Sequence, residues 1–285
     1  MSLRFANLAG RAVLLVGDGM IDVERASGAR FSPDPMAAFA VWDELADWAG
    51  ELGATDVTTP FAATDLGPPV PRPSKVFGIG MNYRDHAAEA KLEIPSSPVV
   101  FTKFPNCISG PHADVVLSSD RVDWEVELVV VMGIRAQRVA VAAAWEHVAG
   151  LAIGQDVSER VVQWSGGGQF SLGKSFPTFG PIGPCLVTPD EVPNPDDLEL
   201  GCSVDGDVVQ KGRTSDMVFG VPRLIAELSA VLPLLPGDVF FTGTPAGIGA
   251  TRKPPRFLQA GEVLETWVEG IGRIRNRLVA GEERP

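Results

Sequence analysis

One stretch of the sequence places several carboxylates inside an apolar run: residues 122–132 read Val-Asp-Trp-Glu-Val-Glu-Leu-Val-Val-Val-Met. If this stretch is a strand, alternate residues share a face, so Asp123, Glu125 and Glu127 lie on one side. Two valines complete that same face, which predicts that both faces are covered by other parts of the protein. Buried carboxylates need a compensating cation. Glu125 and Glu127 lie about 7 Å apart along a strand, so both can reach one ion.

A third carboxylate follows a second apolar run, because Asp156 comes directly after the predicted strand Leu151–Gln155. Together Glu125, Glu127 and Asp156 would form a set of hard oxygen ligands, with no cysteine or histidine close to them in sequence. Such a set suits Mg²⁺, Mn²⁺ or Ca²⁺ better than Zn²⁺. Three protein ligands leave coordination positions for water and substrate, as a catalytic metal requires. The alternative for residues 122–132 alone is an edge strand whose first half faces water.

A histidine and a glutamate have the spacing of a proton-transfer pair. His86 and Glu89 are three residues apart in a helix predicted over Tyr83–Lys91, so they share one helical face. Glu89 can accept a hydrogen bond from one imidazole nitrogen and leave the other nitrogen free to hold or deprotonate water. The alternative is a histidine on a surface helix with an incidental, weak ion pair.

The elements that must position these side chains are mostly strands. An Asp205-Gly206 pair between two apolar runs predicts a hairpin. Helices are expected over Tyr83–Lys91, Val139–Val148 and Phe219–Val231. Because strands and helices do not alternate regularly, a doubly wound sheet or a TIM barrel is disfavoured. The sequence therefore predicts a mixed, β-rich α+β fold with a curved β core and a few peripheral helices. The expected strands are Lys75–Gly80, Pro98–Lys103, Val122–Met132, Leu151–Gln155, Cys185–Thr188, Leu200–Val204, Val208–Lys211, Val239–Thr242, Val263–Val268 and Arg273–Leu278.

The beginning of the chain differs from the rest. Short strand-like runs at Ala12–Val16 and Met20–Val23 precede a single helix expected from Met36 to Trp48. The segment Gly67–Pro73 is rich in proline and is typical of a linker. We therefore predict a small α/β N-terminal domain and linker over residues 1–72 and a larger domain over residues 73–285.

Composition narrows the classes of partner and the compartment. The 285 residues contain 24 Lys and Arg against 36 Asp and Glu, a net charge of −12, which argues against nucleic acid and anionic membrane surfaces. The three cysteines are far apart in sequence, so neither a disulfide framework nor a zinc site is expected. The N-terminal apolar stretch is short and interrupted by arginines, and no apolar run approaches the ~18 residues of a membrane span. We expect a cytoplasmic protein with no membrane partner.

Six motifs follow one another along the chain from about residue 72 to the end. They are Asn82-Tyr-Arg-Asp-His86, Asp123-Trp-Glu-Val-Glu-Leu128, Gln155-Asp-Val-Ser158, Gly173-Lys-Ser175, Gly180-Pro-Ile-Gly-Pro184 and Pro236-Gly-Asp-Val-Phe-Phe-Thr-Gly-Thr-Pro245. In sequence and in order they resemble the motifs of the fumarylacetoacetate hydrolase family, in its acylpyruvate hydrolase-like branch. The resemblance implies a β-roll fold, a homodimer, and one Mg²⁺ or Mn²⁺ per subunit, with Ca²⁺ possible in a crystal.

The same resemblance implies roles for the acidic residues and the histidine. Glu125, Glu127 and Asp156 match the metal ligands of the family, the three residues to which the strand pattern already points. His86 and Glu89 match the water-activating pair of the members that cleave acylpyruvates.

Further positions match residues that contact substrate in the family. Lys174 matches a lysine beside the metal and the substrate, and it completes the expected catalytic group with His86 and Glu89. Arg160 and Gln163 match substrate contacts, and Thr244 matches a hydroxyl that holds a substrate carboxylate.

The expected reaction is metal-dependent hydrolysis of a carbon–carbon bond in a 2,4-dioxo acid of the acylpyruvate or fumarylpyruvate type. A water activated by His86 would attack the 4-carbonyl, and the substrate would be a small anionic 2-oxo acid. The alternatives are a decarboxylase of the oxaloacetate type, an isomerase or hydratase of 2-hydroxy-dienoic diacids from aromatic compound catabolism, and a non-catalytic binder of small acids. Pro177 and Val161 depart from the pattern of many members at positions expected near the substrate channel.

Overall fold

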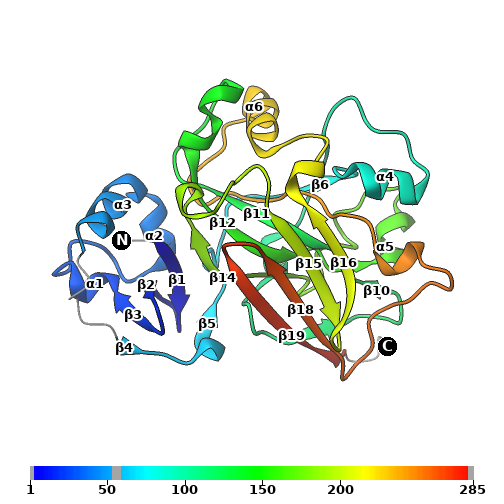
Figure 1. The fold of residues 1–285 in the computed structure, drawn as a ribbon, viewed down its shortest axis with the longest axis horizontal. Coiled ribbons are helices and arrows are strands. Elements are labelled where there is room, and N and C mark those ends of the chain that lie inside the picture. The colour runs from blue at the N-terminus through cyan, green and yellow to red at the C-terminus, as the bar shows by residue number, and fades with distance from the viewer. Residues whose placement is uncertain (1–2, 53–58, 282–285) are drawn as a thin grey trace.

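Strands dominate the structure, and the helices lie at its periphery (Figure 1). The computed structural model describes residues 3–52 and 59–281 of the chain. The predicted mixed, β-rich α+β class is confirmed. Within the described residues, none of the helices has the length and apolar character that a membrane crossing requires.

The larger sheet joins the N-terminal segment to the rest of the chain. Phe5 lies opposite Leu186 in an antiparallel pair of strands, so the segment predicted as a separate domain shares a sheet with the remainder (Figure 1, left). The strand order is β4 (Thr59–Pro60), β3 (Gly19–Asp22), β2 (Arg11–Val16), β1 (Arg4–Leu8), β14 (Gly180–Val187), β12 (Val148–Gln155), β11 (Val126–Met132), β17 (Val239–Phe241), β6 (Val76–Gly80) and β7 (Val99–Thr102), with β5 (Leu66–Gly67) beside β1 and β8 (Ile108–Ser109) beside β14.

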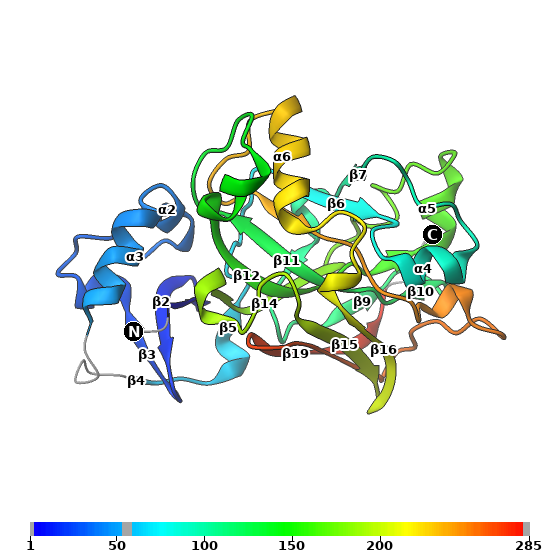
Figure 2. The same cartoon turned by 45° about the horizontal axis from the view of Figure 1, so that its top comes forward.

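A second sheet packs across the middle of the first one (Figure 2). The predicted hairpin at Asp205-Gly206 is confirmed: both residues have positive φ, 50° and 87°, as a tight turn between twisted strands requires. A separate short pair joins β10 (Val122–Asp123) to β13 (Ser158–Glu159). The strand order of the second sheet is β16 (Asp207–Arg213), β15 (Glu199–Val204), β18 (Val263–Val268), β19 (Gly272–Ala280) and β9 (Val115–Leu117).

The predicted helices at Tyr83 and Phe219 are confirmed as α4 (Arg84–Ala90) and α6 (Val221–Val231). The stretch Val139–Val148 was predicted to be an α-helix, and this prediction was wrong. It forms 3₁₀ turns, η3 (Val141–His147), because β12 begins at once and the Ala143 N–H bonds three residues back to the Ala140 carbonyl.

The single helix expected from Met36 to Trp48 is two helices in the structure, because the chain leaves helical geometry at Val41. A short helix after Glu159 was not predicted from the sequence. The helices not yet given bounds are α1 (Val23–Ala26), α2 (Pro35–Phe39), α3 (Trp42–Glu51) and α5 (Arg160–Ser165), and the remaining 3₁₀ turns are η1 (Ala63–Asp65), η2 (Pro105–Cys107), η4 (Pro189–Glu191), η5 (Thr214–Asp216) and η6 (Gly249–Thr251).

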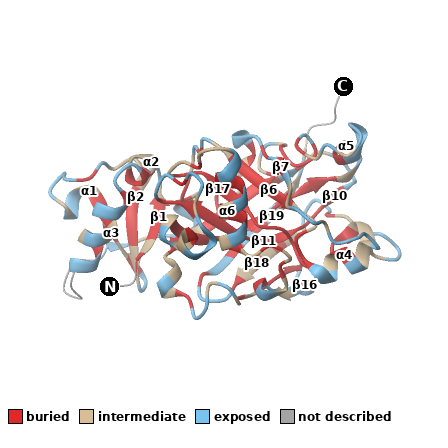
Figure 3. Ribbon diagram, turned by 90° about the horizontal axis from the view of Figure 1, so that it is seen from above, coloured by how far each residue is buried: buried red, intermediate tan, exposed pale blue. Residues whose placement is uncertain are grey.

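The centre of the larger sheet is covered on both faces, as the carboxylate stretch predicts. Every residue of β11 (Figure 3) and of β12 is buried. The stretch 122–132 is not one continuous strand, however, because β10 and β11 are separated at Trp124 and Glu125. Both β12 and β14 begin earlier than their apolar runs predict, at Val148 and Gly180.

Candidate active site

A cavity of about 250 Å³ opens between α4, α5 and the turn that follows β17. Polar side chains from five distant segments meet in it, and apolar side chains make up much of the remaining wall. Glu89 and Glu127, which the sequence also indicates, are not part of this lining. The predicted site residues that line the cavity are His86, Glu125, Asp156, Arg160, Gln163, Lys174 and Thr244.

Three predicted metal ligands lie together. One carboxylate oxygen from each of Glu125, Glu127 and Asp156 lies within 4.8 Å of the others, and all three residues are buried. Antiparallel pairing of β11 with β12 brings them together, since Val126 lies opposite Gln155. The Asp156 N–H also donates to the Glu125 carbonyl at 2.9 Å.

Cations contact two of these three carboxylates. The Lys174 ammonium lies 2.8 Å from Glu125 Oε2 and 2.5 Å from Asp156 Oδ2. Arg160 Nη1 lies 2.6 Å from Glu125 Oε1. A further lysine, Lys103, is fully buried and donates to Asp156 Oδ1 at 2.6 Å. The network therefore restrains both oxygens of Asp156 and both oxygens of Glu125.

Glu127 differs from its neighbours. Its carboxylate accepts the Gly243 N–H at 2.6 Å, and among the described residues no basic side chain forms an ion pair with it. Burial raises the pKa of Glu127 well above its ordinary value, and the charges of Asp156 and Glu125 add to this effect. Burial also opposes ionisation of Glu125, but Lys174 and Arg160 outweigh it and lower that pKa to about 2.

This donor set fits a divalent cation. Three buried carboxylates converge within the span that one ion can bridge, and oxygen ligands are those that Mg²⁺ and Mn²⁺ prefer. Glu127 forms no ion pair among the described side chains, so a bound cation would be the direct charge partner of its carboxylate. The structure is therefore consistent with a metal held by Glu125, Glu127 and Asp156.

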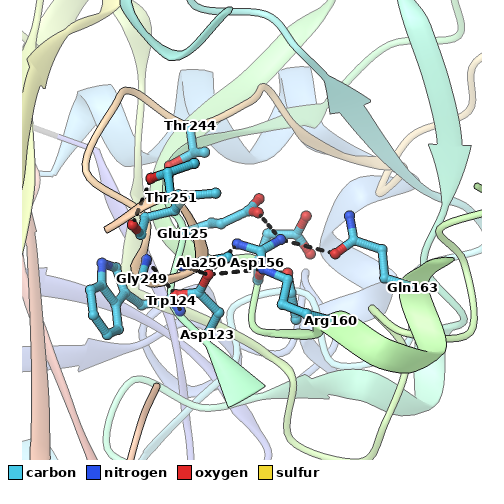
Figure 4. Close-up of polar contacts among 12 residues, drawn as sticks. Asp123, Trp124, Glu125, Asp156, Arg160, Gln163, Thr244, Gly249, Ala250 and Thr251 are labelled. Atoms are coloured by element: carbon cyan, nitrogen blue, oxygen red, sulfur yellow. Dashed lines mark hydrogen bonds and ion pairs between the residues drawn. The ribbon is translucent and has the colours of Figure 1, made fainter. Parts of the chain in front are cut away.

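Asp123, a residue to which the sequence pattern gave no role, organises the side of the cavity formed by α5 (Figure 4). Its Oδ2 accepts from Arg160 Nη2 at 2.6 Å and Nε at 2.8 Å. Its carboxylate also accepts the backbone N–H groups of Gly249 at 2.7 Å and Ala250 at 2.9 Å. One buried carboxylate therefore fixes both α5 and the 3₁₀ turn η6. The sequence feature that could have indicated Asp123 is its place on the same strand face as Glu125.

Gln210 is a second residue that the sequence did not indicate. Its Oε1 accepts the Val126 N–H at 2.9 Å, and its Nε2 donates to the Pro245 carbonyl and to Thr244 Oγ1, both at 2.8 Å. Since a backbone N–H can only donate and a carbonyl can only accept, the orientation of this amide is fixed. Thr244 Oγ1 therefore accepts from Gln210. Within the part of the chain that the structure describes, its own proton has no acceptor, so it can donate to a ligand in the cavity.

His86 lines the cavity from α4. Its Nδ1 lies 3.4 Å from Glu89 Oε2, so the predicted pair is together, although at a long separation. Glu89 also accepts the Gly247 N–H with both oxygens at 3.2 Å. This contact joins α4 to the turn after β17. A carboxylate can only accept, so the pairing favours a proton on Nδ1 and a free lone pair on Nε2.

Helix α5 supplies Arg160 and Gln163 from one face. Arg160 Nη1 donates to Gln163 Oε1 at 2.9 Å. A Cβ added at Gly173 would lie 2.5 Å from the backbone nitrogen of Gln163. Only glycine at this position therefore lets the segment that carries Lys174 pack so closely against α5. Val161 and Pro177, which were expected near the substrate channel, are exposed and do not line the cavity.

Comparison with known proteins identifies relatives. A family model described as fumarylacetoacetate (FAA) hydrolase C-terminal matches residues 75–279. A human protein named oxaloacetate tautomerase FAHD2A, mitochondrial, is 47% identical over 214 residues, which is 74% of this chain and 68% of that protein. Since that name indicates mitochondria, the cytoplasmic location stays a prediction, as do the homodimer and the division at residues 72 and 73.

Solved structures resemble the whole fold. An HpcE candidate from Mycobacterium smegmatis has a TM-score of 0.92 at 48% identity, covering 98% of this chain and 100% of that one. Maleylpyruvate hydrolase from Sphingobium sp. SYK-6, in complex with manganese(II) and pyruvate, has a TM-score of 0.82 at 28% identity, with coverage of 98% and 100%.

Proposed function

The chain belongs to the fumarylacetoacetate hydrolase family, and from this premise we propose that it moves a proton at carbon 3 of a small 2-oxo acid, interconverting the keto and enol forms. The observation that carries the proposal is the meeting of two features in one cavity. One is the set of buried carboxylates Glu125, Glu127 and Asp156, of which Glu125 and Asp156 line the cavity. The other is His86, an imidazole whose Nε2 is available for proton transfer.

Each residue would have a definite part in this reaction. A divalent cation bound by the three carboxylates would act as a Lewis acid on the 2-oxo group and favour its enolate. The free Oγ1 proton of Thr244 would donate to the substrate carboxylate. In the keto-to-enol direction, His86 Nε2 would take the proton from carbon 3 and then give it to the 2-oxo oxygen, and in the reverse direction it would move the same proton back. Glu89 would hold Nδ1–H and balance the charge of the imidazolium.

Positive side chains would orient the anionic substrate. Lys174 and Arg160 both line the cavity and lie against the carboxylates. They place positive charge where an enolate oxygen would develop, in a site largely removed from water. The name of the human relative, oxaloacetate tautomerase, supports this class of reaction.

Hydrolysis of the bond between carbons 3 and 4 of a 2,4-dioxo acid is a second candidate. The pairing of His86 with Glu89 favours it, because the same base could deprotonate a water instead of carbon 3. The relative named maleylpyruvate hydrolase supports it at lower identity. Decarboxylation needs no such base, so a His86→Ala variant should retain decarboxylation if that is the reaction.

The test is to incubate the Mn²⁺-loaded protein with acetylpyruvate and with oxaloacetate in D₂O and follow both by NMR. We expect faster conversion of enol to keto form and faster deuterium entry at carbon 3 than without enzyme, with no acetate released. His86→Gln should remove the acceleration and leave Mn²⁺ affinity unchanged. Stoichiometric acetate and pyruvate from acetylpyruvate would instead establish the hydrolase. Unchanged rates for both compounds would refute the proposal.

A further inference from the structure

We propose that the outer half of the cavity selects a 2-oxo acid whose tail is apolar, preferably aromatic, over one whose longer tail carries a second carboxylate into that half. The inference rests on the proposed function, which supplies the 2-oxo acid head group, and it narrows the substrate class of that same site. It depends on three features of the cavity: a row of aromatic rings, the direction of α5, and the distribution of charge.

A row of aromatic side chains leads away from the carboxylates. The Lys174 ammonium, which contacts Glu125, lies 5.3 Å from the centre of the Phe101 ring. The Phe101 and Phe170 rings meet edge to face at 5.7 Å, and Phe170 meets Trp164 in the same way at 5.0 Å. All three rings line the cavity. The row therefore begins beside the carboxylates and ends at Trp164.

Helix α5 sets the direction of this row. Arg160 and Trp164 are four residues apart, so they share a helical face and lie about 6 Å apart along the axis. Arg160 contacts Glu125, whereas Trp164 is 58% exposed. Leu92, also in the lining, is 49% exposed. A ligand held at the carboxylates would extend its tail toward these exposed apolar surfaces and cover them.

The charges of the cavity oppose a second carboxylate in that place. Among the described residues that line it, the permanent cations are Arg160 and Lys174. Both are bonded to acidic side chains at the inner end. A carboxylate at the outer end would lie against Trp164 and Phe170 without a cation, which is unfavourable in a partly dry site. An apolar tail would bury its own surface there and the surface of the rings.

The experiment measures by calorimetry how tightly the Mn²⁺-loaded protein binds three 2-oxo acids that differ only in their tails: 2-oxobutanoate, 4-phenyl-2-oxobutanoate and 2-oxoglutarate. We expect the phenyl compound to bind at least roughly tenfold more tightly than 2-oxobutanoate, and 2-oxoglutarate to bind no more tightly than 2-oxobutanoate. Tighter binding of 2-oxoglutarate than of the phenyl compound, or equal binding of all three, would overturn the inference.

Two variants assign the preference to the aromatic wall. In Trp164→Ala, the ratio of the Kd of 2-oxobutanoate to that of the phenyl compound should fall roughly fivefold or more. Trp164→Arg should tighten binding of 2-oxoglutarate. Phe104→Ala is the matched control, because Phe104 is 48% exposed and lies outside the lining. A ratio unchanged in Trp164→Ala, or reduced equally in Phe104→Ala, would contradict the assignment.

The same measurements separate this inference from the proposed function. Preferential binding of the phenyl compound without catalysed exchange at carbon 3 would refute the function and support the apolar selection. Catalysed exchange at carbon 3 without preferential binding of the phenyl compound would support the function and refute the apolar selection. If none of the three acids binds, the head-group site is wrong and both proposals fail.

Discussion

Replacing Asp123 with asparagine tests whether a single buried carboxylate holds α5 and the 3₁₀ turn η6 in place. Asp123 is fully buried and accepts two bonds from Arg160, together with the backbone N–H groups of Gly249 and Ala250. The Asp123→Asn change preserves the shape of the side chain and removes its charge. The guanidinium of Arg160, whose side chain is 11% exposed, then keeps only Glu125 as an acidic partner.

The expected loss follows from the burial of the pair. Removing one partner of a buried ion pair lowers the free energy of unfolding by about 3–5 kcal/mol. Because the asparagine oxygen can still accept some of these bonds, we expect about 3 kcal/mol, which corresponds to a fall in Tm of roughly 6–12 °C. Asp114→Asn is the matched control. Asp114 pairs with Arg277 at 2.7 Å, but the side chains are 42% and 65% exposed, so the expected loss is about 0–1 kcal/mol.

Urea unfolding followed by tryptophan fluorescence measures both variants against the wild type at the same Mn²⁺ concentration. The reasoning requires Asp123→Asn to lose clearly more stability than Asp114→Asn. Equal losses in the two variants would refute it, as would a loss below about 1 kcal/mol for Asp123→Asn. In either case burial would not be what gives the Asp123 pair its strength.

Three further predictions concern the cavity. Gln210→Leu leaves the Thr244 hydroxyl without its donor, so oxalate binding should weaken roughly tenfold by calorimetry while Mn²⁺ affinity stays unchanged. Mn²⁺ at about 100 times its Kd should stabilise the wild type by about 2.7 kcal/mol, and Glu127→Gln should abolish this shift in calorimetric melting. Gly173→Ala places a methyl group 2.5 Å from the backbone of α5 and should lower kcat/KM at least roughly tenfold, whereas Gly50→Ala, with open space around its Cβ, should not.

The sequence predicted those parts of the site that depend on local patterns. Alternation along residues 122–132 placed Glu125 and Glu127 on one face, and the end of the next apolar run indicated Asp156. The structure brings these residues together because β11 and β12 pair directly. The spacing of His86 and Glu89 likewise requires only a helix, and α4 provides it.

Other parts of the site depend on contacts that local patterns do not encode. Gln210 lies in an ordinary hairpin strand and reaches Val126 across 84 residues of sequence. Helix α5 has two β-branched valines in six residues and ends at a run of glycines, so its propensity is weak. Its N-cap is Glu159, whose carboxylate accepts the Val162 N–H, and glutamate is not among the residues that usually cap helices.

The balance of charge around the cavity links the proposed reaction to the inferred substrate. Four buried carboxylates face three basic side chains, so this group has a net charge of −1 when all are ionised. A bound divalent cation changes this to +1, which would attract an anion to a protein whose overall charge is −12. A monocarboxylate then brings the site to neutrality, whereas a dicarboxylate leaves one negative charge near the aromatic wall. Electrostatics and the apolar lining therefore favour the same class of ligand. The charged groups are Asp123, Glu125, Glu127, Asp156, Lys103, Arg160 and Lys174.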